Sequence, residues 1–376
     1  MKEIKMVDLK GQYDKIKIEV DNAIQDVIDT SSFIKGTHVK EFQKELENFL
    51  SVKHVVACGN GTDALQIALM SLNLKPGDEI ITSGFTFIAT AEVIALLGLK
   101  PVLVDVDPNT FLLDVNKLEK AITDKTKAII PVHLFGQCAD MNSLSAIAKK
   151  HNLYLIEDTA QALGTDYSIN NNTSKKAGTI GDIGCTSFFP SKNLGCFGDG
   201  GAIFTNNDDL FDKISAIANH GMRKKYYHEL IGVNSRLDNI QAAILRVKLK
   251  HLNEYNLARQ NVAGFYDKAF FNNSKLQIPF RTKNSNHIFH QYTLITKDVD
   301  RDKMQEYLKS KGIPSMVYYP VPIHKQEAFK NYKFSHNEFS VTEDLCKRVI
   351  SLPMHTELTD EQLNYIVDNV NKATLI

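Results

Sequence analysis

The sequence predicts an α/β protein built on one large, mainly parallel sheet flanked by helices, followed by a smaller α+β region. Short apolar runs rich in β-branched residues alternate with amphipathic helical patterns through the first two-thirds of the chain, which is typical of a sheet covered by helices on both faces. The pattern changes after Gly232, where a long helical stretch precedes scattered strand and helix signals. The length of 376 residues suits two domains, and we expect them to span residues 1–250 and 251–376.

Seven apolar runs are predicted strands, enough for one large sheet. They cover residues 54–58, 79–82, 101–107, 128–133, 153–158, 185–189 and 202–206. The amphipathic stretches between them predict helices at residues 63–72, 88–97, 115–122, 141–150 and 208–218. Elsewhere, we expect residues 236–270 to be helical and the asparagine-rich stretch 168–176 to be a surface hairpin or loop.

The composition argues against several classes of function. Lysine plus arginine and aspartate plus glutamate number 44 each, and the chain lacks the basic stripe typical of a nucleic-acid-binding protein. The five cysteines are scattered and form no C-x-x-C pair, which argues against a zinc ribbon and a disulfide framework. The first residues lack an apolar core of signal-peptide length, and no run approaches the roughly 18 apolar residues of a membrane span. We therefore expect a cytoplasmic protein with reduced thiols, and neither nucleic acid nor a membrane as partner.

The stretch "ACGNGTDAL" (57–65) places a glycine turn between a predicted strand and a predicted helix. Gly59, Asn60 and Gly61 form the turn, and Thr62 follows at the start of the helix. Free amide groups at a helix N-terminus, with a hydroxyl beside them, bind anions, and phosphate is the natural ligand. Taken alone, the same stretch is also typical of a capped helix that simply follows a glycine turn.

Asp158 closes the apolar strand in "LYLIEDTAQALG" (153–164). Open α/β sheets bind their ligands at the carboxyl ends of the strands, so Asp158 would face a crevice and pair with a buried cationic nitrogen. Gln161, three residues later, would aim a donor at the same ligand. The alternative interpretation is that Asp158 only caps the segment that follows it.

Lys192 follows the predicted strand 185–189, in the stretch "FFPSKNLGCFGDGG" (188–201), with Ser187 before it. A lysine that is partly desolvated in a crevice has a lowered pKa and attacks a carbonyl as the free amine. On its own, a loop lysine is far more often a solvated charge. Together with Asp158 and the glycine turn, however, it supplies the parts of a pyridoxal phosphate site: an amine, a carboxylate for the pyridine nitrogen and amides for the phosphate.

These motifs resemble the fold-type I aminotransferases of the nucleotide-sugar family named DegT/DnrJ/EryC1/StrS. The resemblance covers essentially the whole chain, and the matching segments have the order and spacing of the family. The segments are "GNGTDAL" (59–65), "PGDEIITSGFTFIATAE" (76–92), "PVLVDVD" (101–107), "IEDTAQALG" (156–164), "GDIGCTSFFPSKNLGCFGDGGAIFTN" (181–206), "GVNSRLDNIQAAIL" (232–245), "YYPVPIHKQ" (318–326) and "SLPMH" (351–355).

The resemblance implies pyridoxal 5'-phosphate as cofactor, with pyridoxamine phosphate as its intermediate form. Lys192 would hold the cofactor aldehyde as an imine, and Asp158 would pair with the pyridine nitrogen. Gln161 would lie near the phenolic oxygen of the ring, and Phe87 would stack on the ring. The residues implied to bind the phosphate are Gly61, Thr62, Ser187 and Asn234 of the partner subunit. The last of these implies a homodimer with shared active sites.

The implied reaction transfers an amino group from L-glutamate to a nucleotide-linked keto sugar. The motifs look closest to enzymes that act at C3 of a UDP-2-acetamido-3-keto hexose or hexuronate, whose products enter lipopolysaccharide and other surface polysaccharides. The positions implied to meet the sugar or its diphosphate are Arg236, Tyr318, Tyr319 and His324. Two alternatives stay open: a dTDP- or UDP-linked 3-keto- or 4-keto-6-deoxyhexose as substrate, and a non-catalytic pyridoxal phosphate or nucleotide-sugar sensor. Lys192 favours transamination, because dehydratase relatives carry histidine at this position.

Other features are interpreted as structural. His287 and His290 have no third ligand of matching pattern nearby, so we expect no metal site. Asp105 and Asp107 in "VDVDP" are interpreted as the end of a strand before a turn. Apolar walls that limit the access of water to the imine are expected from three aromatic residues, Phe87, Phe188 and Phe189.

Overall fold

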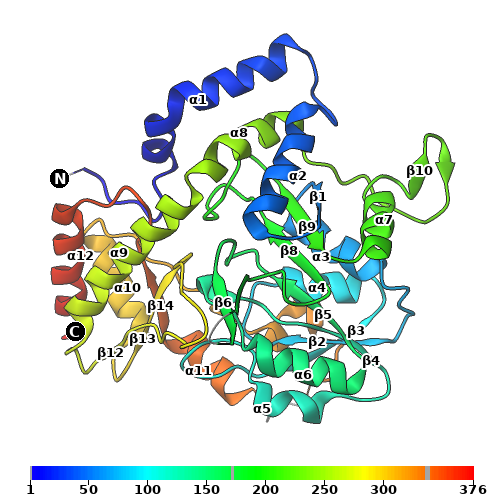
Figure 1. The fold of residues 1–376 in the computed structure, drawn as a ribbon. Coiled ribbons are helices and arrows are strands. Elements are labelled where there is room, and N and C mark those ends of the chain that lie inside the picture. The colour runs from blue at the N-terminus through cyan, green and yellow to red at the C-terminus, as the bar shows by residue number, and fades with distance from the viewer. Residues whose placement is uncertain (1, 171–172, 335–338) are drawn as a thin grey trace.

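A computed structural model describes residues 2–170, 173–334 and 339–376. Its centre is a seven-stranded sheet in the order β1-β9-β8-β5-β4-β2-β3 (Figure 1). The strands are β1 (His54–Cys58), β2 (Glu79–Ser83), β3 (Lys100–Val104), β4 (Thr126–Ile130), β5 (Tyr154–Asp158), β8 (Ile183–Ser187) and β9 (Gly201–Thr205). Neighbouring strands are parallel, except that β9 runs antiparallel to both β1 and β8.

Helices cover both faces of this sheet. They are α2 (Thr37–Leu50), α3 (Gly61–Met70), α4 (Ala89–Leu96), α5 (Val115–Leu118), α6 (Met141–His151), α7 (Asp208–Ile217) and α8 (Asn239–Lys250). Successive residues of a strand point to opposite faces. Ile80 packs in the cluster with α3, α4 and α7, whereas Ile81 packs in the cluster with α5 and α6. Near β1 and β9, α2 and α8 cover the second face. Burial on both faces explains why the strands are nearly continuous apolar runs.

The smaller region has a three-stranded antiparallel sheet in the order β12-β13-β14 and an apolar cluster of its own. Its elements are α9 (Leu252–Phe270), β12 (Leu276–Gln277), β13 (Tyr292–Thr296), α10 (Arg301–Ser310), α11 (Ser340–Arg348), β14 (Val349–Leu352) and α12 (Asp360–Ala373). Ile4, from the start of the chain, joins this cluster, and both termini lie beside the smaller region (Figure 1). Helix α1 (Leu9–Asp29) packs against α8. A division of the chain between residues 250 and 251 stays a prediction.

The predicted fold class is confirmed, because the large sheet is mainly parallel and a smaller α+β region follows it. All seven predicted strands lie in the large sheet. Some end earlier than the apolar runs do: β3 stops at Val104, and Asp107 already belongs to a turn, where it accepts a hydrogen bond from the N–H of Asn109. The helical stretch 236–270 is divided into α8 and α9 at His251.

Two hairpins lie outside the main sheets. The predicted surface hairpin is formed by β6 (Asp166–Asn170) and β7 (Thr173–Lys176), while residues 171 and 172 lie outside the described residues. A second hairpin, β10 (Met222–Lys224) with β11 (Tyr227–His228), projects beside α7 (Figure 1). In the part of the chain that the structure describes, no helix has both the length and the apolar character needed to cross a membrane.

Candidate active site

Three of the predicted site residues lie at, or shortly after, the ends of two neighbouring parallel strands. Strand β5 ends at Asp158 and β8 ends at Ser187, and Asp158 is paired in register with Cys185 of β8. Lys192 follows in the loop that returns the chain to β9. Because the carboxyl ends of parallel strands lie at the same edge of a sheet, Asp158, Ser187 and Lys192 share one edge. The carboxylate of Asp158 is close enough to influence the charge of Lys192.

The Asp158 side chain is held in one orientation by two donors. The residue is only 6% exposed. Thr90, on α4, donates a hydrogen bond from Oγ1 to Oδ2 of Asp158 over 2.9 Å. The backbone N–H of Ala160 donates to the other carboxylate oxygen, Oδ1, over 3.1 Å. A carboxylate fixed by donors at both oxygens is oriented before any ligand arrives.

Lys192 has the environment of a reactive amine. Its Nζ makes no hydrogen bond or ion pair with the described residues. Burial lowers the pKa of Lys192 to about 8, and the nearby Asp158 acts in the opposite direction. The side chain is surrounded by protein but keeps part of its surface open. The lowered pKa predicted from the sequence is therefore confirmed, and an appreciable fraction of the amine is uncharged near neutral pH.

Asn193 anchors the Lys192 loop to the smaller region. Its Nδ2 donates to Oδ1 of Asn256 over 2.7 Å and to the carbonyl of Ile288 over 3.3 Å. Its Oδ1 lies 3.3 Å from Nδ1 of His290. The residue next to the reactive lysine is thus bonded to two segments that lie far away in the sequence, so the smaller region helps to fix the position of Lys192.

The N-terminus of α3 approaches the end of β8 very closely. A Cβ at Gly61 would lie 2.6 Å from Cβ of Ser187, so this approach requires glycine. Asn60 caps the helix, with Oδ1 accepting from the N–H of Asp63 over 2.8 Å. The N–H groups of Gly61 and Thr62 lie in the first turn of the helix, where backbone N–H groups have no partner within the helix, and they are beside the side chain of Ser187. Such an arrangement fits a phosphate group.

Ser235 ties a third segment to the same turn. The N–H of Gly59 donates to Oγ of Ser235 over 2.9 Å, and this hydroxyl donates to Oδ2 of Asp63 over 2.6 Å. The two neighbours of Ser235 are predicted site residues. Asn234 is exposed, whereas Arg236 is half-buried and lines a groove of about 280 Å³ between β1, α2 and α7.

Gln161, which follows β5, is bonded to one of the predicted substrate residues, Tyr319. Its Oε1 accepts from the N–H of Phe135 over 2.7 Å, and its Nε2 donates to the hydroxyl of Tyr319 over 3.1 Å. The rings of Tyr318 and Tyr319 lie 5.9 Å apart, and Tyr319 lies 6.3 Å from the ring of Phe87. Phe87 is 55% exposed, so its ring offers an open face for stacking on a planar ligand.

His324 lies in a neighbouring packed cluster. It is buried, and its Nε2 lies 3.0 Å from a carboxylate oxygen of Glu343. Its ring stacks on Phe339, with the two ring centroids 4.4 Å apart. The predicted substrate residues therefore occupy different places. Tyr319 is hydrogen-bonded to Gln161, which follows β5, whereas His324 is held by α11.

Comparison with known proteins identifies the family. A model of the DegT/DnrJ/EryC1/StrS aminotransferase family matches residues 14–371. This chain belongs to that family. It is 46% identical over 363 residues to the UDP-2-acetamido-2-deoxy-3-oxo-D-glucuronate aminotransferase of Pseudomonas aeruginosa, a match that covers 96% of this chain and 98% of the relative. It is 44% identical to the pleiotropic regulatory protein of Geobacillus stearothermophilus, over 98% and 97% of the two chains.

A solved structure points to the cofactor. NtdA of Bacillus subtilis with bound cofactor pyridoxamine phosphate is similar with a TM-score of 0.90 and 30% identity, over 100% of this chain and 86% of NtdA. The DegT/DnrJ/EryC1/StrS protein described here is thus a transaminase that depends on pyridoxal phosphate. Its residues fit this cofactor, because three features meet at one sheet edge: an amine with no bonding partner in the described ranges, an oriented carboxylate, and a helix end that a Cβ would obstruct. The role of each residue stays a prediction.

Thr90 was not among the residues predicted from the sequence. It is the single polar residue among the buried residues of α4, the others being Ala89, Ala91, Val93 and Ile94. A lone hydroxyl on the buried side of a short apolar helix is therefore the signal that marks it. Its partner is 68 positions away in the sequence, so the bond itself follows only from the fold.

The expectation that three aromatic residues form apolar walls in this aminotransferase is not met by Phe188. Its ring is fully buried against Phe42 of α2, with centroids 5.3 Å apart, so the prediction that Phe188 lines the site is wrong. Successive residues at a strand end point to opposite sides; Ser187 faces the start of α3, and Phe188 therefore faces α2. Phe189 is exposed, as Phe87 is.

One buried group resembles a metal site in composition. Ligand atoms of His133, Cys138 and Glu157 lie within 4.8 Å of one another. However, the carboxylate of Glu157 accepts from Nε2 of His133 over 2.8 Å and from three backbone N–H groups between residues 178 and 181. These hydrogen bonds already occupy the carboxylate and the imidazole, so the group holds the loop before β8 in place.

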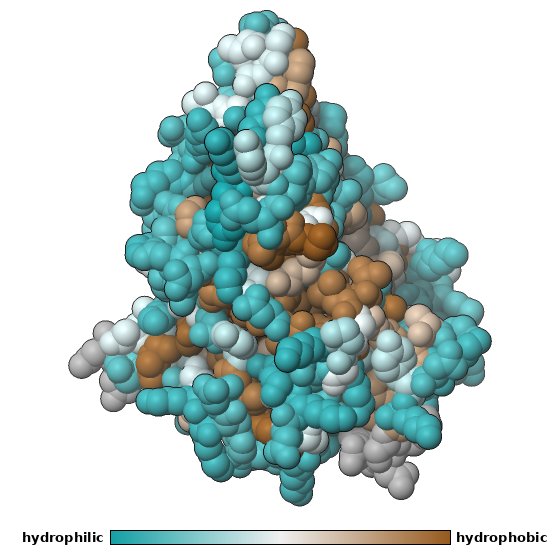
Figure 2. Space-filling view, turned by 90° about the vertical axis from the view of Figure 1, so that its right-hand side faces the viewer, coloured by the Kyte–Doolittle hydropathy of each residue, from teal (hydrophilic) through white to brown (hydrophobic). Residues whose placement is uncertain are grey.

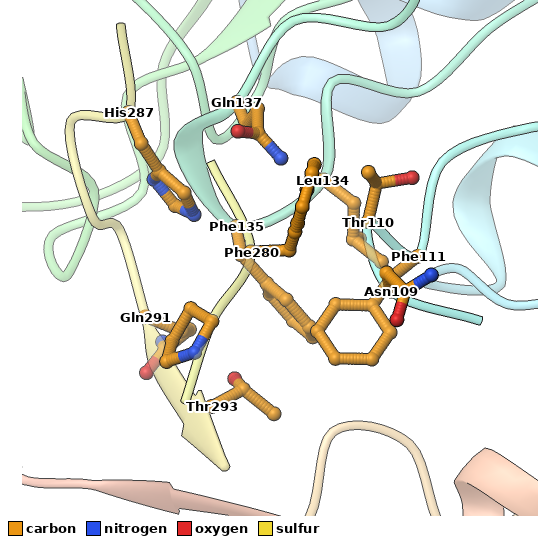
Figure 3. Close-up of a pocket in the computed structure, with 11 residues that line it drawn as sticks. Asn109, Thr110, Phe111, Leu134, Phe135, Gln137, Phe280, His287, Gln291 and Thr293 are labelled. Carbon is orange, nitrogen blue, oxygen red and sulfur yellow. The ribbon is translucent and has the colours of Figure 1, made fainter. Parts of the chain in front are cut away.

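A small pocket lies at the seam between the two regions (Figure 3). The ring of His287 and the side chain of Gln291 line it from the smaller region, opposite Phe111 and Phe135 of the larger one. Its free space of about 10 Å³ corresponds to about one water molecule. Lys192 and the other predicted site residues do not line it, so it is a small gap in packing and is separate from the active site.

Proposed function

We propose that this protein transfers the amino group of L-glutamate to C3 of a UDP-linked 2-acetamido-3-keto hexose or hexuronate. The observation that carries the chemistry is the amine of Lys192, which has no partner in the part of the chain that the structure describes, near the oriented carboxylate of Asp158. The substrate is supported by the 46% identical relative, whose name specifies a UDP-linked 3-oxo sugar. The amino sugar formed would serve lipopolysaccharide or another surface polysaccharide.

Lys192 would carry the proton of the reaction. The bound cofactor supplies an electron sink for the electrons left when the Cα–H bond of the donor breaks. Nζ of Lys192 would bind the cofactor in the resting enzyme, and would later take the Cα proton and return it as an acid. Its pKa of about 8 suits both roles near neutral pH, because the neutral and charged forms are both populated.

The other residues would orient and protect the reacting atoms. Asp158 would hold a proton at the pyridine nitrogen, with Thr90 fixing the plane of its carboxylate. The amides of Gly61 and Thr62 would bind the phosphate, because the helix end carries partial positive charge. Phe87 would cover one face of the ring and exclude water, as its exposed aromatic face suggests.

We also propose a homodimer in which each subunit completes the site of the other. Asn234 is exposed, yet its neighbour Ser235 is bonded to the phosphate-binding turn, so the position of Asn234 is well defined. Figure 2 shows apolar side chains gathered in the middle of one face, with hydrophilic ones around them, and such a patch suits a subunit interface.

Mixing two inactive variants tests this dimer. In a hybrid of Lys192→Ala and Asn234→Ala subunits, one site has both the lysine and the asparagine. We expect the mixture to recover part of the wild-type rate that neither parent shows alone. A sedimentation mass of one chain, or no recovery in hybrids shown to have formed, contradicts the proposal.

A sensor is the second candidate function. It is favoured by the 44% identical relative, which is named a pleiotropic regulatory protein. A protein that only binds cofactor or nucleotide sugar would need the phosphate turn but not a free amine at Lys192. A dTDP-linked or 4-keto-6-deoxy sugar is the alternative within the enzyme class.

We assign the protein to the cytoplasm, because all five cysteines are free and buried and unpaired thiols are typical of reducing compartments.

The function is tested with a panel of nucleotide-linked 3-keto and 4-keto sugars, each incubated with glutamate and the holoenzyme. We expect the mass shift of an amino sugar with UDP-linked 3-keto acetamido sugars, and none with Lys192→Ala. Amination of 4-keto sugars alone would contradict the proposed substrate and favour the alternative, a 4-keto-6-deoxy sugar. Bound cofactor with no turnover of any sugar or amino acid would favour the sensor.

A further inference from the structure

Asp105, directly after β3, is a buried carboxylate whose partners come mainly from the other end of the chain. Thr342 donates from its N–H over 2.9 Å and from Oγ1 over 2.7 Å, and the N–H of Val341 donates over 3.1 Å. Nζ of Lys117 forms an ion pair with Asp105 at 3.0 Å, and the carboxylate is fully buried. Burial alone would raise the pKa of Asp105, but the hydrogen bonds from Thr342 and Lys117 bring it below its ordinary value.

Asp107 lies at the same strand end and, among the residues that the structure describes, has only local partners. Its Oδ1 accepts from the N–H of Asn109, from the N–H of Thr110 and from the hydroxyl of Thr110, at 2.9, 2.9 and 3.1 Å. The interpretation as a strand end before a turn is therefore confirmed for Asp107. Asp105 does more, because it joins the end of β3 to the first turn of α11.

Helix α11, which Asp105 holds at its start, carries Glu343. One oxygen of Glu343 lies 3.0 Å from Nε2 of His324, and the other lies 2.7 Å from Nζ of Lys325. Lys325 and His324 together lower the pKa of Glu343 to about 2. Phe339, just before the helix, stacks on His324. The helix therefore fixes two consecutive residues of the segment 318–326.

The same segment reaches the active site through Tyr319. The N–H of Ile323 donates to the carbonyl of Gly84 over 3.3 Å, so the segment lies along the loop after β2. The ring of Tyr319 lies 6.0 Å from that of Phe85, and its hydroxyl accepts from Gln161. A continuous set of contacts thus runs from the end of β3, through α11, to the site.

We propose that Asp105 is a positioning residue for sugar binding. Residues 318–326, in which Tyr319 contacts Gln161, are called the substrate wall. Through α11 and Glu343, Asp105 fixes this wall. The inference rests on the proposed function, since it takes the substrate wall as the side that meets the nucleotide sugar. The wall is largely irregular in structure, and ordering such a segment costs conformational entropy. Fixing it before the sugar arrives increases affinity without altering the chemistry.

Hydrogen exchange of the holoenzyme without sugar tests the mechanical part. Asp105→Asn keeps the size of the side chain but removes its charge and replaces an acceptor by a donor. Asp107→Asn is the matched control, because it makes the same change at a residue with local partners. We expect peptides from residues 318–326 and from α11 to exchange faster in Asp105→Asn and at the wild-type rate in Asp107→Asn. Wild-type exchange of these peptides in Asp105→Asn overturns the proposal.

Half-reactions test the functional part. We expect Asp105→Asn to raise the KM for the sugar by about tenfold, the effect of one hydrogen bond to a charged group. The glutamate half-reaction, followed by cofactor absorbance, should stay within about twofold of wild type, since Lys192 and Asp158 are untouched. An equal loss in both half-reactions, or loss of bound cofactor, would show a merely structural role and overturns the proposal.

A second variant covers the case in which Asp105→Asn does not fold. Glu343→Gln leaves Asp105 intact and removes the charge that holds Lys325 and His324, so it should give the same split between the half-reactions. A wild-type KM in this variant overturns the proposal. Failure of the proposed function gives a different result, because the wild-type enzyme would then aminate no nucleotide sugar. The hydrogen-exchange comparison would still decide whether Asp105 fixes the substrate wall.

Discussion

The cofactor side and the substrate wall of this active site are built in different ways. Asp158 ends β5 and Lys192 lies in the loop after the neighbouring parallel strand β8, so the register of one sheet helps to place them together. The substrate wall, residues 318–326, contains no strand; Glu343 of α11 holds His324 and Lys325, and Asp105, far away in the sequence, bonds to the start of that helix. We therefore expect a single substitution to loosen the substrate wall more readily than the cofactor side.

This contrast predicts which half-reaction each variant impairs. Changes on the cofactor side should impair both half-reactions, because glutamate and the sugar use the same cofactor. Changes in the substrate wall should mainly impair the sugar half-reaction. Single-turnover experiments with each substrate, read by cofactor absorbance, therefore separate the two sides.

The largest effect is expected for Lys192→Ala. We expect both half-reactions to fall by about 10⁴-fold, the upper range for removing a general acid–base group. Lys75→Ala, a change at an exposed lysine, is the control and should keep the wild-type rate. A Lys192→Ala variant that retains one half-reaction would break the assignment of proton transfer to this residue.

The pH dependence of cofactor capture should follow the charge of Lys192. Its pKa of about 8 means that the unreactive, protonated amine predominates below this pH and the neutral amine predominates above it. We expect the rate at which cofactor-free protein captures pyridoxal phosphate to rise by about tenfold per pH unit and to level off above about pH 8. Asp158→Asn should move the midpoint to lower pH, because the carboxylate raises the pKa of Lys192. A midpoint near the ordinary value for lysine would contradict the lowered pKa.

Thr90→Val is expected to have a smaller effect on both half-reactions. Valine keeps the shape of threonine but cannot donate to Asp158, and one hydrogen bond to a charged group corresponds to about a tenfold change. The melting temperature serves as the control for packing. A loss confined to the sugar half-reaction would show that Thr90 does not act through the cofactor side.

Tyr319→Phe should give the smallest effect, restricted to the sugar. The variant loses only the hydroxyl that accepts from Gln161, so we expect a rise in the sugar KM of about threefold to tenfold. The glutamate half-reaction measured on the same sample is the internal control. An equal effect on both would assign Tyr319 to the cofactor side.

The same contrast explains what the sequence can reveal. The fold class and the meeting of Asp158 with Lys192 are predictable, because apolar runs mark parallel strands and the carboxyl ends of such strands share an edge. Thr90 and Asp105 could not be predicted, since each acts across a long stretch of sequence on a partner that only the fold brings near. The placement of Phe188 is not predictable either, because the direction of a side chain changes with every residue at a strand end.

The most direct test of the account is to find which lysine carries the cofactor. Reduction of the holoenzyme with borohydride, followed by digestion and mass spectrometry, should attach the cofactor to Lys192 alone. Lys248 is the informative competitor, because burial also lowers its pKa to about 8, but its Nζ is bonded to the carbonyl of Gly195. Label on Lys248, or no label on Lys192 in protein that contains cofactor, would contradict the account.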